Sequence, residues 1–457
     1  MVRDCEDAVP RRLQVIEQRE TTMTETLKKS TKSTKSTKST TKPQEQPMPK
    51  KNTTPATKSS ENATFTVMQE HLSKLIAAVA PMVPAKPMLP VLENIVFELK
   101  NDILEATGGA SNEIVARHHI DVINDGGVEN VKFLLPGKKF GKIVNALPSG
   151  QDIQIEVNTK NLVTSQLTTD GGVETSTSVQ VKLTCGKIHF NLNGVDGDAD
   201  GQSAMIGDDG NWKEMECDVE GFLHAINKVA FCASKDETRR VLNGVYVCHD
   251  YEQKSYPDAV AATDGRRLAA CECNFHAEGK TKVEFIIASD FVKKVQSAFA
   301  EQKGTLKIAT NGSTVKMTCE SGMEVAFSKI EGAFPQFRQI IPQGTPKFKV
   351  NVPNDALASV VKRVAIIITD AAQGLKLSFA DNTLTASAKN AEGEAKDVLE
   401  IAFEPKDGIT LGFNPVYIQD AVNALEGETV DIGLESAIAP VTFREAGFLY
   451  LLMPMRG

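Results

Sequence analysis

The chain has 457 residues, of which 41% are hydrophobic and 24% are charged, and its mean hydropathy is −0.21. The sequence contains no apolar run long enough to cross a bilayer and no apolar secretory segment near its first residues, so we expect neither a membrane protein nor an exported one. The formal net charge of −8 divides into +5 over residues 1–62 and −13 over the rest. An acidic body excludes a protein whose whole surface binds nucleic acid.

Residues 1–63 are predicted to form a disordered, low-complexity basic tail. The tract KKSTKSTKSTKSTTK begins at Lys28 and is followed by residues rich in Pro, Gln, Lys and Thr, with few apolar side chains. Such a segment buries too little surface to offset the entropy lost on ordering. Two roles remain open: a solvated spacer, which we favour, and a weak contact with nucleic acid.

The first predicted domain covers residues 64–211 and contains two amphipathic helices. In both, apolar residues recur at positions i, i+3, i+4 and i+7, which places them on one face of a helix. Strands are predicted over residues 95–99, 103–107 and 113–120, and a hairpin over residues 162–192 is lengthened by a polar, turn-rich segment at 168–178. The two apolar stripes are Leu72, Leu75, Ile76 and Val79, followed by Phe140, Ile143, Val144 and Leu147.

Two further domains, residues 212–345 and 346–457, repeat this order of helices and strands. The two stripes of a domain start 68, 70 and 61 residues apart in the three copies, and a strand follows each second helix from Ile153, Leu306 and Val430. Repeats of this length are whole domains, so the sequence predicts an α+β protein of three repeated domains, each with two helices and a β-sheet. The later stripes are Phe222, Ala225, Ile226 and Val229; Val292, Val295 and Phe299; Leu357, Val360, Val361 and Val364; and Ile418, Ala421, Val422 and Leu425.

Catalytic and metal-binding motifs are weak throughout the chain. Residues 196–201, DGDADG, begin like a calcium loop, but its twelfth position is Gly207 in place of Glu. The run from Gly137, GKKFGKI, has the wrong spacing for a phosphate loop, and His118 and His119 alternate across a strand, so they cannot both bind one metal ion. The eight cysteines show no C-x-x-C spacing and are expected to be buried thiols in a reducing compartment. We therefore predict no catalytic residues, no metal ions and no cofactors.

Three segments carry a specific combination of motifs in colinear order. They are RRVLNGVYV with AATDGRRLAACE, over residues 239–247 and 261–272, FSKIEGAFPQF over 327–337, and YLLMPMRG over 450–457. With FTVMQEHLSKLIAAV and KPMLPVLENIVFEL in the first domain, they resemble the bacterial and phage sliding clamp, the beta subunit of the replicative DNA polymerase III. The resemblance covers residues 64–457. It implies the DNA clamp fold, in which two chains join head to tail as a homodimer and close a six-domain ring.

The function that this resemblance implies is that of a processivity factor without catalytic activity. Such a protein encircles duplex DNA irrespective of sequence, and its implied partners are double-stranded DNA, the replicative DNA polymerase, the clamp loader and a second copy of the chain, with no membrane. The implied location is the cytoplasm, with association to the nucleoid during replication. An enzyme would need a unique polar cluster that the sequence does not offer. A phage structural or assembly protein with repeated β-rich domains remains the alternative, although it would need neither the TDGRR motif nor basic helices.

Basic residues on the polar faces of the predicted helices are suited to contact phosphates. Such contacts carry no sequence information and permit sliding. Lysine on a solvated helix face is also ordinary, so the pattern by itself leaves both interpretations open. The predicted DNA-binding residues are Lys74, Lys86, Lys138, Lys139, Lys142, Arg239, Arg240, Lys293, Lys294, Lys362 and Arg363, and Lys228 belongs to the same basic helix faces.

The resemblance also implies a pocket between the second and third domains, which takes short linear peptides from partner proteins. Aliphatic and Met side chains would form an adaptable apolar groove, with Arg267 and Arg456 near its rim. A terminal strand in the core would account for part of this set without a pocket. The predicted pocket residues are Leu242, Thr263, Gly265, Arg266, Arg267, Leu268, Pro335, Ile340, Ile438, Pro440, Leu451, Leu452, Met453, Pro454, Met455 and Arg456.

The implied dimer contact joins the first domain of one chain to the third domain of the other. An apolar centre rimmed by opposite charge suits such an interface. Four residues outside this interface differ from those of the family. Gln339 stands where the family commonly has Arg, Arg266 where it often has His, and Ser289 and Asp290 where it often has basic residues. The predicted interface residues are Lys187, Phe190 and Leu192 on one side, and Ile367, Ile368, Glu392 and Glu394 on the other.

Overall fold

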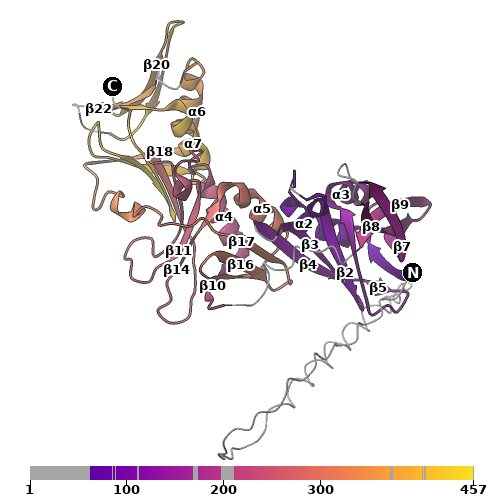
Figure 1. Cartoon of the computed structure of the whole chain (residues 1–457). Helices are drawn as coiled ribbons and strands as arrows, with labels where there is room; N and C mark the ends of the chain where they lie inside the picture. The colour runs from indigo at the N-terminus through magenta and orange to yellow at the C-terminus, as the bar shows by residue number, and fades with distance from the viewer. Residues whose placement is uncertain are drawn as a thin grey trace, which may run out of the picture. The chain divides into compact units, whose positions relative to one another are not determined.

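The computed structural model describes residues 62–455 except 85, 88, 111–112, 168–172, 197–209, 371–373, 404 and 406–407. Side chains are described throughout these residues except at 160–167, 173–177 and 196. The basic tail, the loop at 197–201 and Arg456 therefore lie outside the described residues. Figure 1 shows the described elements in chain order.

The helices form at every position that the apolar stripes predict, two to a domain. Their stripes are buried except for the half-buried Ile143, and the two helices of each domain pack against each other (Figure 1). Gln296, the polar position in the fifth stripe, is half-buried, and Ala298 is buried beside Phe299. The helices are α2 (Gln69–Val79), α3 (Gly137–Ala146), α4 (Val219–Ala230), α5 (Ser289–Phe299), α6 (Asn354–Ala365) and α7 (Pro415–Ala424).

Strands of the first domain form most of one sheet, in the order β10-β15-β16-β17-β4-β3-β2-β6-β9-β8-β7-β1-β5. The expected strands after the first helix are confirmed. The polar residues 173–178, which we expected in a turn, are instead part of β8, because they pair with β7 in a longer ladder. The first-domain strands are β1 (Asn62–Met68), β2 (Asn94–Lys100), β3 (Ile103–Ala110), β4 (Ile114–Asp121), β5 (Ile123–Asn124), β6 (Asn130–Pro136), β7 (Asp152–Leu167), β8 (Val173–Cys185) and β9 (Ile188–Asp196).

The second domain contributes strands to two sheets. Four of its strands extend the first sheet, and four others begin an eight-stranded sheet ordered β14-β11-β12-β13-β25-β24-β23-β18. The second-domain strands are β10 (Lys213–Asp218), β11 (Gly244–His249), β12 (Asp258–Thr263), β13 (Arg267–Glu272), β14 (Val283–Ala288), β15 (Thr305–Thr310), β16 (Thr314–Cys319) and β17 (Glu324–Ser328).

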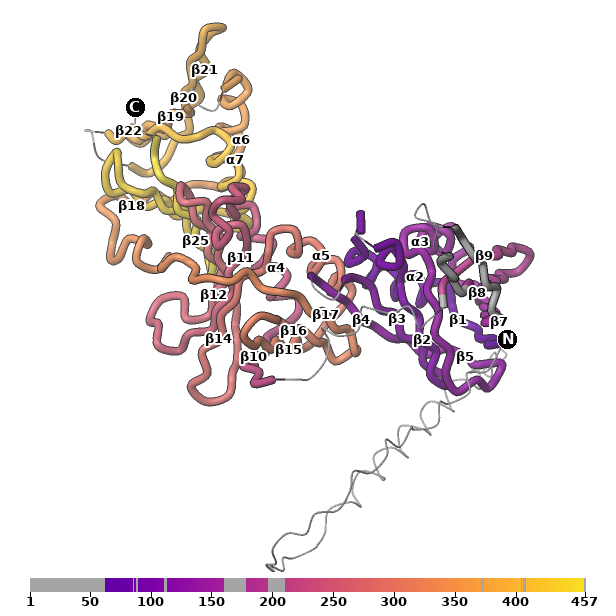
Figure 2. The backbone as a smooth tube through the Cα atoms, viewed as in Figure 1, coloured from indigo at the N-terminus to yellow at the C-terminus, as the bar shows by residue number. Residues whose placement is uncertain are grey.

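The third domain completes the eight-stranded sheet and adds a four-stranded sheet ordered β21-β20-β19-β22. Its strand β25, drawn in yellow in Figure 2, pairs with β13 of the second domain. The third-domain strands are β18 (Phe348–Pro353), β19 (Leu375–Ala380), β20 (Thr383–Lys389), β21 (Glu394–Glu400), β22 (Ile409–Phe413), β23 (Thr429–Leu434), β24 (Val441–Glu445) and β25 (Phe448–Leu452).

One strand pairing recurs in all three domains. The strand before the first helix pairs with the strand after the second, as β1 with β7, β10 with β15 and β18 with β23. The first helical N–H then donates to a carbonyl oxygen just before that later strand, from Gln69, Val219 and Asn354 over 2.9, 3.0 and 3.0 Å. The repeat that the sequence predicts is therefore present down to single backbone hydrogen bonds.

Two antiparallel strand pairs join consecutive domains. The first joint is the pair β4–β17, between the first and second domains, and the second joint is the pair β13–β25, between the second and third. One large core contains the apolar faces of the helices, and a smaller core around Tyr246, Phe334 and Phe337 lies at the second joint. The seven described cysteines are buried, as expected, and are free thiols.

Candidate functional site

The TDGRR turn, Thr263 to Arg267, connects β12 to β13 and is fixed by its own side chains. Oγ1 of Thr263 donates to the carbonyl oxygen of Arg267 over 2.6 Å and accepts from the N–H of Gly265 over 3.1 Å. Oδ1 of Asp264 accepts from the N–H groups of Arg266 and Arg267 over 2.9 and 3.1 Å. Gly265 has a φ of +88°, which residues with a Cβ rarely adopt. These bonds define the conformation of the turn at the start of β13.

The second joint brings this turn to predicted pocket residues almost two hundred positions away. Its register pairs Arg267 with Leu452 and Leu268 with Leu451. The N–H of Met453 then donates to the carbonyl oxygen of Arg266 over 3.0 Å. Two segments that the sequence singled out separately thus meet side by side.

The predicted pocket residues divide between the two faces of this strand pair. Leu242, Leu268 and Leu451 belong to the smaller core, whereas Leu452 belongs to the large core with the helices. Side chains alternate along a strand, so these residues cannot line one groove along its length. They can share a surface only at the end of the strand pair, beside the TDGRR turn.

Exposed apolar side chains from several segments complete the predicted set. Ile438 is 80% exposed, Ile340 51%, Met453 41% and Met455 36%. A contiguous exposed patch of large apolar side chains marks an interaction site, so these four residues are candidates for one. Of the others, Pro335 and Arg266 are exposed, Pro440 and Pro454 are half-buried, Thr263 is buried, and Arg456 lies outside the described residues.

Arg267 is not the rim residue that we expected. Its side chain is 9% exposed, and it donates to Asp264 over 3.0 Å, to Asp420 over 2.6 Å and to the carbonyl oxygen of Phe231 over 2.8 Å. The guanidinium carbon also lies 4.2 Å from the ring centre of Tyr417. The sequence does not indicate these partners, because Asp420 and Tyr417 belong to helix α7 of another domain, about 150 residues further along the chain.

Lys228 is likewise not a DNA-facing residue. Its side chain is 4% exposed, and its Nζ lies 2.6 Å from Oε1 of Glu445 and donates to the carbonyl oxygen of Ala424 over 2.6 Å. Glu426 lies 3.4 Å away. A lysine buried against carboxylates cannot reach a phosphate, so this prediction is wrong.

Most of the other predicted DNA-binding residues are exposed, and three of them have acidic neighbours. Lys74 lies 3.8 Å from Glu301, Arg239 3.0 Å from Asp236, and Arg363 2.6 Å from Asp397. The hydrogen bond from Arg363 lowers the pKa of Asp397. Lys294 is half-buried, with its Nζ 5.6 Å from the ring centre of Phe291. The remaining predicted residues are all exposed: Lys86, Lys138, Lys139, Lys142, Arg240, Lys293 and Lys362.

The predicted dimer residues lie on or beside two strands of the described chain, β9 and β21. Phe190 and Leu192 are half-buried on β9, which pairs with β6 only at its last two residues and so leaves most of one side open. Lys187 is exposed in the turn before β9, and β21 is the last strand of the four-stranded sheet. Ile367 and Ile368 are half-buried just after α6, and Glu392 and Glu394 are exposed at the start of β21.

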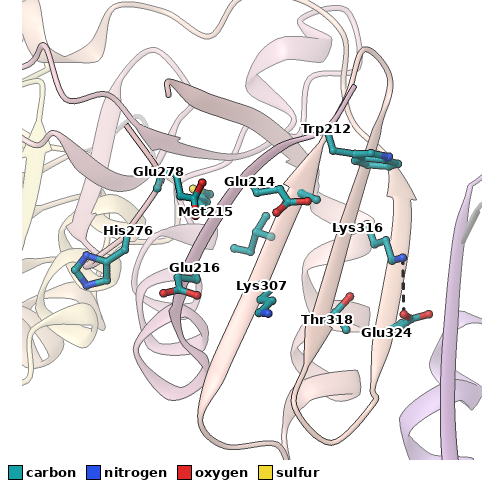
Figure 3. A pocket seen from close by; sticks show the side chains of 13 residues that line it. Trp212, Glu214, Met215, Glu216, His276, Glu278, Lys307, Lys316, Thr318 and Glu324 are labelled. Atoms are coloured by element: carbon teal, nitrogen blue, oxygen red, sulfur yellow. Dashed lines mark ion pairs between the residues drawn. The ribbon is translucent and has the colours of Figure 1, made fainter. Parts of the chain in front are cut away.

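A hollow of about 560 Å³ lies elsewhere, on the face of β10, β15, β16 and β17 (Figure 3). Trp212 and His276 stand at its sides, and charged residues such as Glu214 and Lys307 cover its floor. Lys316 and Glu324, from the neighbouring strands β16 and β17, pair on one side of it at 3.8 Å. The described residues contain no group of three or more His, Cys, Asp or Glu side chains that could hold a metal ion. Nor is any described helix both long and apolar enough to span a membrane.

Solved structures of sliding clamps share this fold. The sliding clamp of Pseudomonas aeruginosa bound to griselimycin has a TM-score of 0.73 and 21% identity, over 87% of this chain and 100% of that one. The beta sliding clamp of Caulobacter crescentus has a TM-score of 0.73 and 22% identity, over 87% of this chain and 99% of that one. At these identities the likeness concerns the fold alone.

Sequence comparisons reach the same family. The beta sliding clamp of Salmonella typhimurium is 25% identical over 404 residues, which are 86% of this chain and 99% of the relative. Family models of the DNA polymerase III beta subunit match in order, the N-terminal domain at 63–198, the central domain at 216–336 and the C-terminal domain at 338–456. A phage assembly protein is not favoured by these matches. The chain therefore belongs to the DNA polymerase III beta subunit family.

Proposed function

We propose that this protein is a DNA sliding clamp, a processivity factor that encircles duplex DNA and tethers the replicative polymerase. The observation that carries the proposal is the match of all three consecutive domains to the three domains of the DNA polymerase III beta subunit. The protein then acts by enclosing the DNA and holding the polymerase to it, and it catalyses no reaction. Its place of action is the cytoplasm, on replicating DNA.

The ring requires a second copy of the chain. The open side of β9 in the first domain and the end strand β21 in the third are complementary, because both offer backbone groups for another strand. Phe190 and Leu192 would meet Ile367 and Ile368, with Lys187 opposite the carboxylates of Glu392 and Glu394. The domain limits in this proposal are residues 64–211, 212–345 and 346–457.

Contact with DNA would come from exposed basic side chains on the helices. Lys138, Lys139 and Lys142 are exposed on α3, and Lys293 and Lys362 are exposed on α5 and α6. Flexible lysines bind phosphates as point charges without reading bases, so the ring could slide. The clamp loader would supply the step that opens the ring.

Partner peptides would dock at the end of the second joint. The exposed apolar residues Ile340, Ile438 and Met453 offer anchors there, and Met side chains adapt to different sequences. The same surface would serve the polymerase and the loader in turn. We expect modest affinity from a few buried aliphatic anchors of the peptide.

Retention on closed DNA tests the proposed function directly. The clamp is incubated with its clamp loader and ATP on nicked circular DNA, and then half of the sample is linearised by a restriction enzyme before gel filtration. A ring stays on the circle and slides off the ends of the linear form. Equal retention on both forms, or protection of one defined sequence in a footprint, would contradict the proposal.

A further inference from the structure

Two buried cations connect the second and third domains on the helix side of the second joint. Lys228 extends from α4, and Arg267 lies at the start of β13. Both contact α7 of the third domain, Lys228 through the carbonyl oxygen of Ala424 and Arg267 through Asp420. The helix that covers the joint is therefore held near its middle and at its last residue.

The surroundings of Arg267 leave it little freedom to move. Its guanidinium lies against the ring of Tyr417, at 4.2 Å, and 5.5 Å from the ring centre of Phe231 on its other neighbour, the end of α4. Asp264 and Asp420 each accept one of its N–H groups, so two carboxylates neutralise its single charge. Nothing remains of that charge to attract an acidic group on a peptide.

Direct contacts connect Arg267 to the surface where a peptide would dock. Asp264 binds Arg267 through Oδ2 and fixes the backbone of the TDGRR turn through Oδ1. The carbonyl oxygen of Arg266 in this turn accepts the N–H of Met453, which is one of the exposed apolar residues. A chain of direct contacts thus runs from α7 through Asp420, Arg267 and Asp264 to the turn and Met453.

We infer that Arg267 is a positioning residue for the partner surface and does not bind the peptide itself. It aligns the TDGRR turn with α7, so that exposed residues from two domains present one surface. The inference rests on the proposed function, because it concerns the same site. It specifies that peptide recognition at this site is apolar and does not use a charge on Arg267.

Asp420→Asn separates the two roles of Arg267, because it removes the carboxylate charge on one side of the guanidinium and weakens its hold there. If Arg267 were a peptide ligand, freeing it would leave peptide binding unchanged or strengthen it. If it is a positioning residue, the same change loosens the turn and weakens binding. The sign of the effect therefore decides between them.

The measurement is a fluorescence titration of the full-length dimer with a labelled peptide copied from the C-terminal segment of the replicative polymerase. We expect Asp420→Asn and Arg267→Met each to weaken binding about tenfold, and the double variant to weaken it no further, because both break the same interaction. The matched control is Asp431→Asn, which removes an ion pair with Lys349, 2.8 Å away on the neighbouring strand β18. The control should bind like the unchanged protein.

The outcomes are distinguishable. If the unchanged protein does not bind the peptide, the proposed function fails at this site and the inference falls with it. If the unchanged protein binds and Asp420→Asn binds equally or more tightly, the inference is overturned while the clamp stands. Should Asp420→Asn unfold, Tyr417→Leu removes the stacking partner without exposing a charge, and the same weakening is expected of it; equal binding by this variant overturns the inference too.

Discussion

The two joints between domains use the same device, an antiparallel strand pair, yet they are stabilised differently. At the first joint, Arg117 of β4 donates to Glu324 of β17 over 3.0 Å, and its side chain is 31% exposed. On the same face of this strand pair Val115 and Ala326 form a small buried cluster, and the other face contributes Ile114, Ala116, Val325 and Phe327 to the large core. At the second joint, Arg267 and Lys228 are buried and a separate core of fourteen residues surrounds the strands.

This difference has an energetic meaning. An ion pair in contact with water contributes little, because solvation offsets the attraction and salt screens it. A buried cation that loses its partner costs much more, since an uncompensated charge remains in a medium of low polarity. The ion pair of the first joint is therefore expected to tolerate substitution, whereas the buried cations of the second joint are not. The proposed partner surface lies at the second joint.

The largest effect is expected from removing a buried charge at the second joint. Lys228→Ala leaves Glu445 without its main partner and should lower the free energy of unfolding by about 4 kcal/mol. Arg117→Ala at the first joint should lower it by about 1 kcal/mol or less. Urea unfolding of both variants checks the comparison. Equal losses would mean that the joints do not differ as their burial indicates.

The proposed contact between two chains extends the comparison. Phe190→Ala combined with Ile368→Ala removes apolar surface from both proposed sides and should weaken the dimer by about 3 kcal/mol, roughly a hundredfold in Kd. Sedimentation at submicromolar concentration should then report a monomer. Ile123→Ala, which truncates a half-exposed residue on β5, should leave the dimer intact. A double variant that remains a dimer would refute this interface.

Peptide binding at the end of the second joint is expected to be lost without disturbing the strand pairing at its centre. Deleting Met453–Gly457 removes the hydrogen bond from Met453 to Arg266 and the exposed methionines, but leaves β25 paired. Peptide affinity should fall by more than about tenfold, or 1.4 kcal/mol. Mass in solution and retention on circular DNA should not change. Equal peptide binding by full-length and shortened protein would place the partner site elsewhere.

Exposed basic residues of the first and second domains test whether these domains also contact DNA. Lys86, Arg239 and Arg240 replaced by Glu should weaken retention on DNA. The dependence of binding on salt should also fall, by about one unit of slope for each phosphate that the variant no longer binds. Thermal unfolding should stay near that of the unchanged protein. Lys307→Glu, in the hollow of Figure 3, is the control for a general loss of charge, and a similar weakening in this control would argue against a defined DNA-facing surface.

The smallest expected effect is a dependence on pH at the second joint. Burial opposes ionisation of Glu445, but hydrogen bonds from Lys228 and from the N–H groups of Gly427 and Glu426 outweigh it and lower its pKa. A carboxyl group with a lower pKa in the folded state contributes stability above its unfolded pKa of about 4.3, and this stability is lost as the pH falls through the folded value. Unfolding from about pH 5 to about pH 3 should therefore be less pH-dependent in Glu445→Gln. An identical dependence would contradict the assignment.

The sequence predicts the helices and strands well, because apolar periodicity is local and repeats three times. It also singles out Leu268 and Leu451, although only the strand pair shows that they share a core. The burial of Arg267 and Lys228 could not be predicted, since their acidic partners lie 153 and 217 residues away. One local signal existed: Lys228 lies three residues after Ala225 and next to Val229, at the margin of the buried stripe of α4.

The second joint also has a consequence during synthesis of the chain. Arg267 of β13 is made 185 residues before its pairing partner Leu452. At ribosomal rates of about 5–20 residues per second, β13 remains an unpaired edge for roughly 10–40 s. An apolar strand edge of this kind is open to pairing with other nascent chains. The strand that completes the proposed partner surface is thus also the strand that ends a period of aggregation risk.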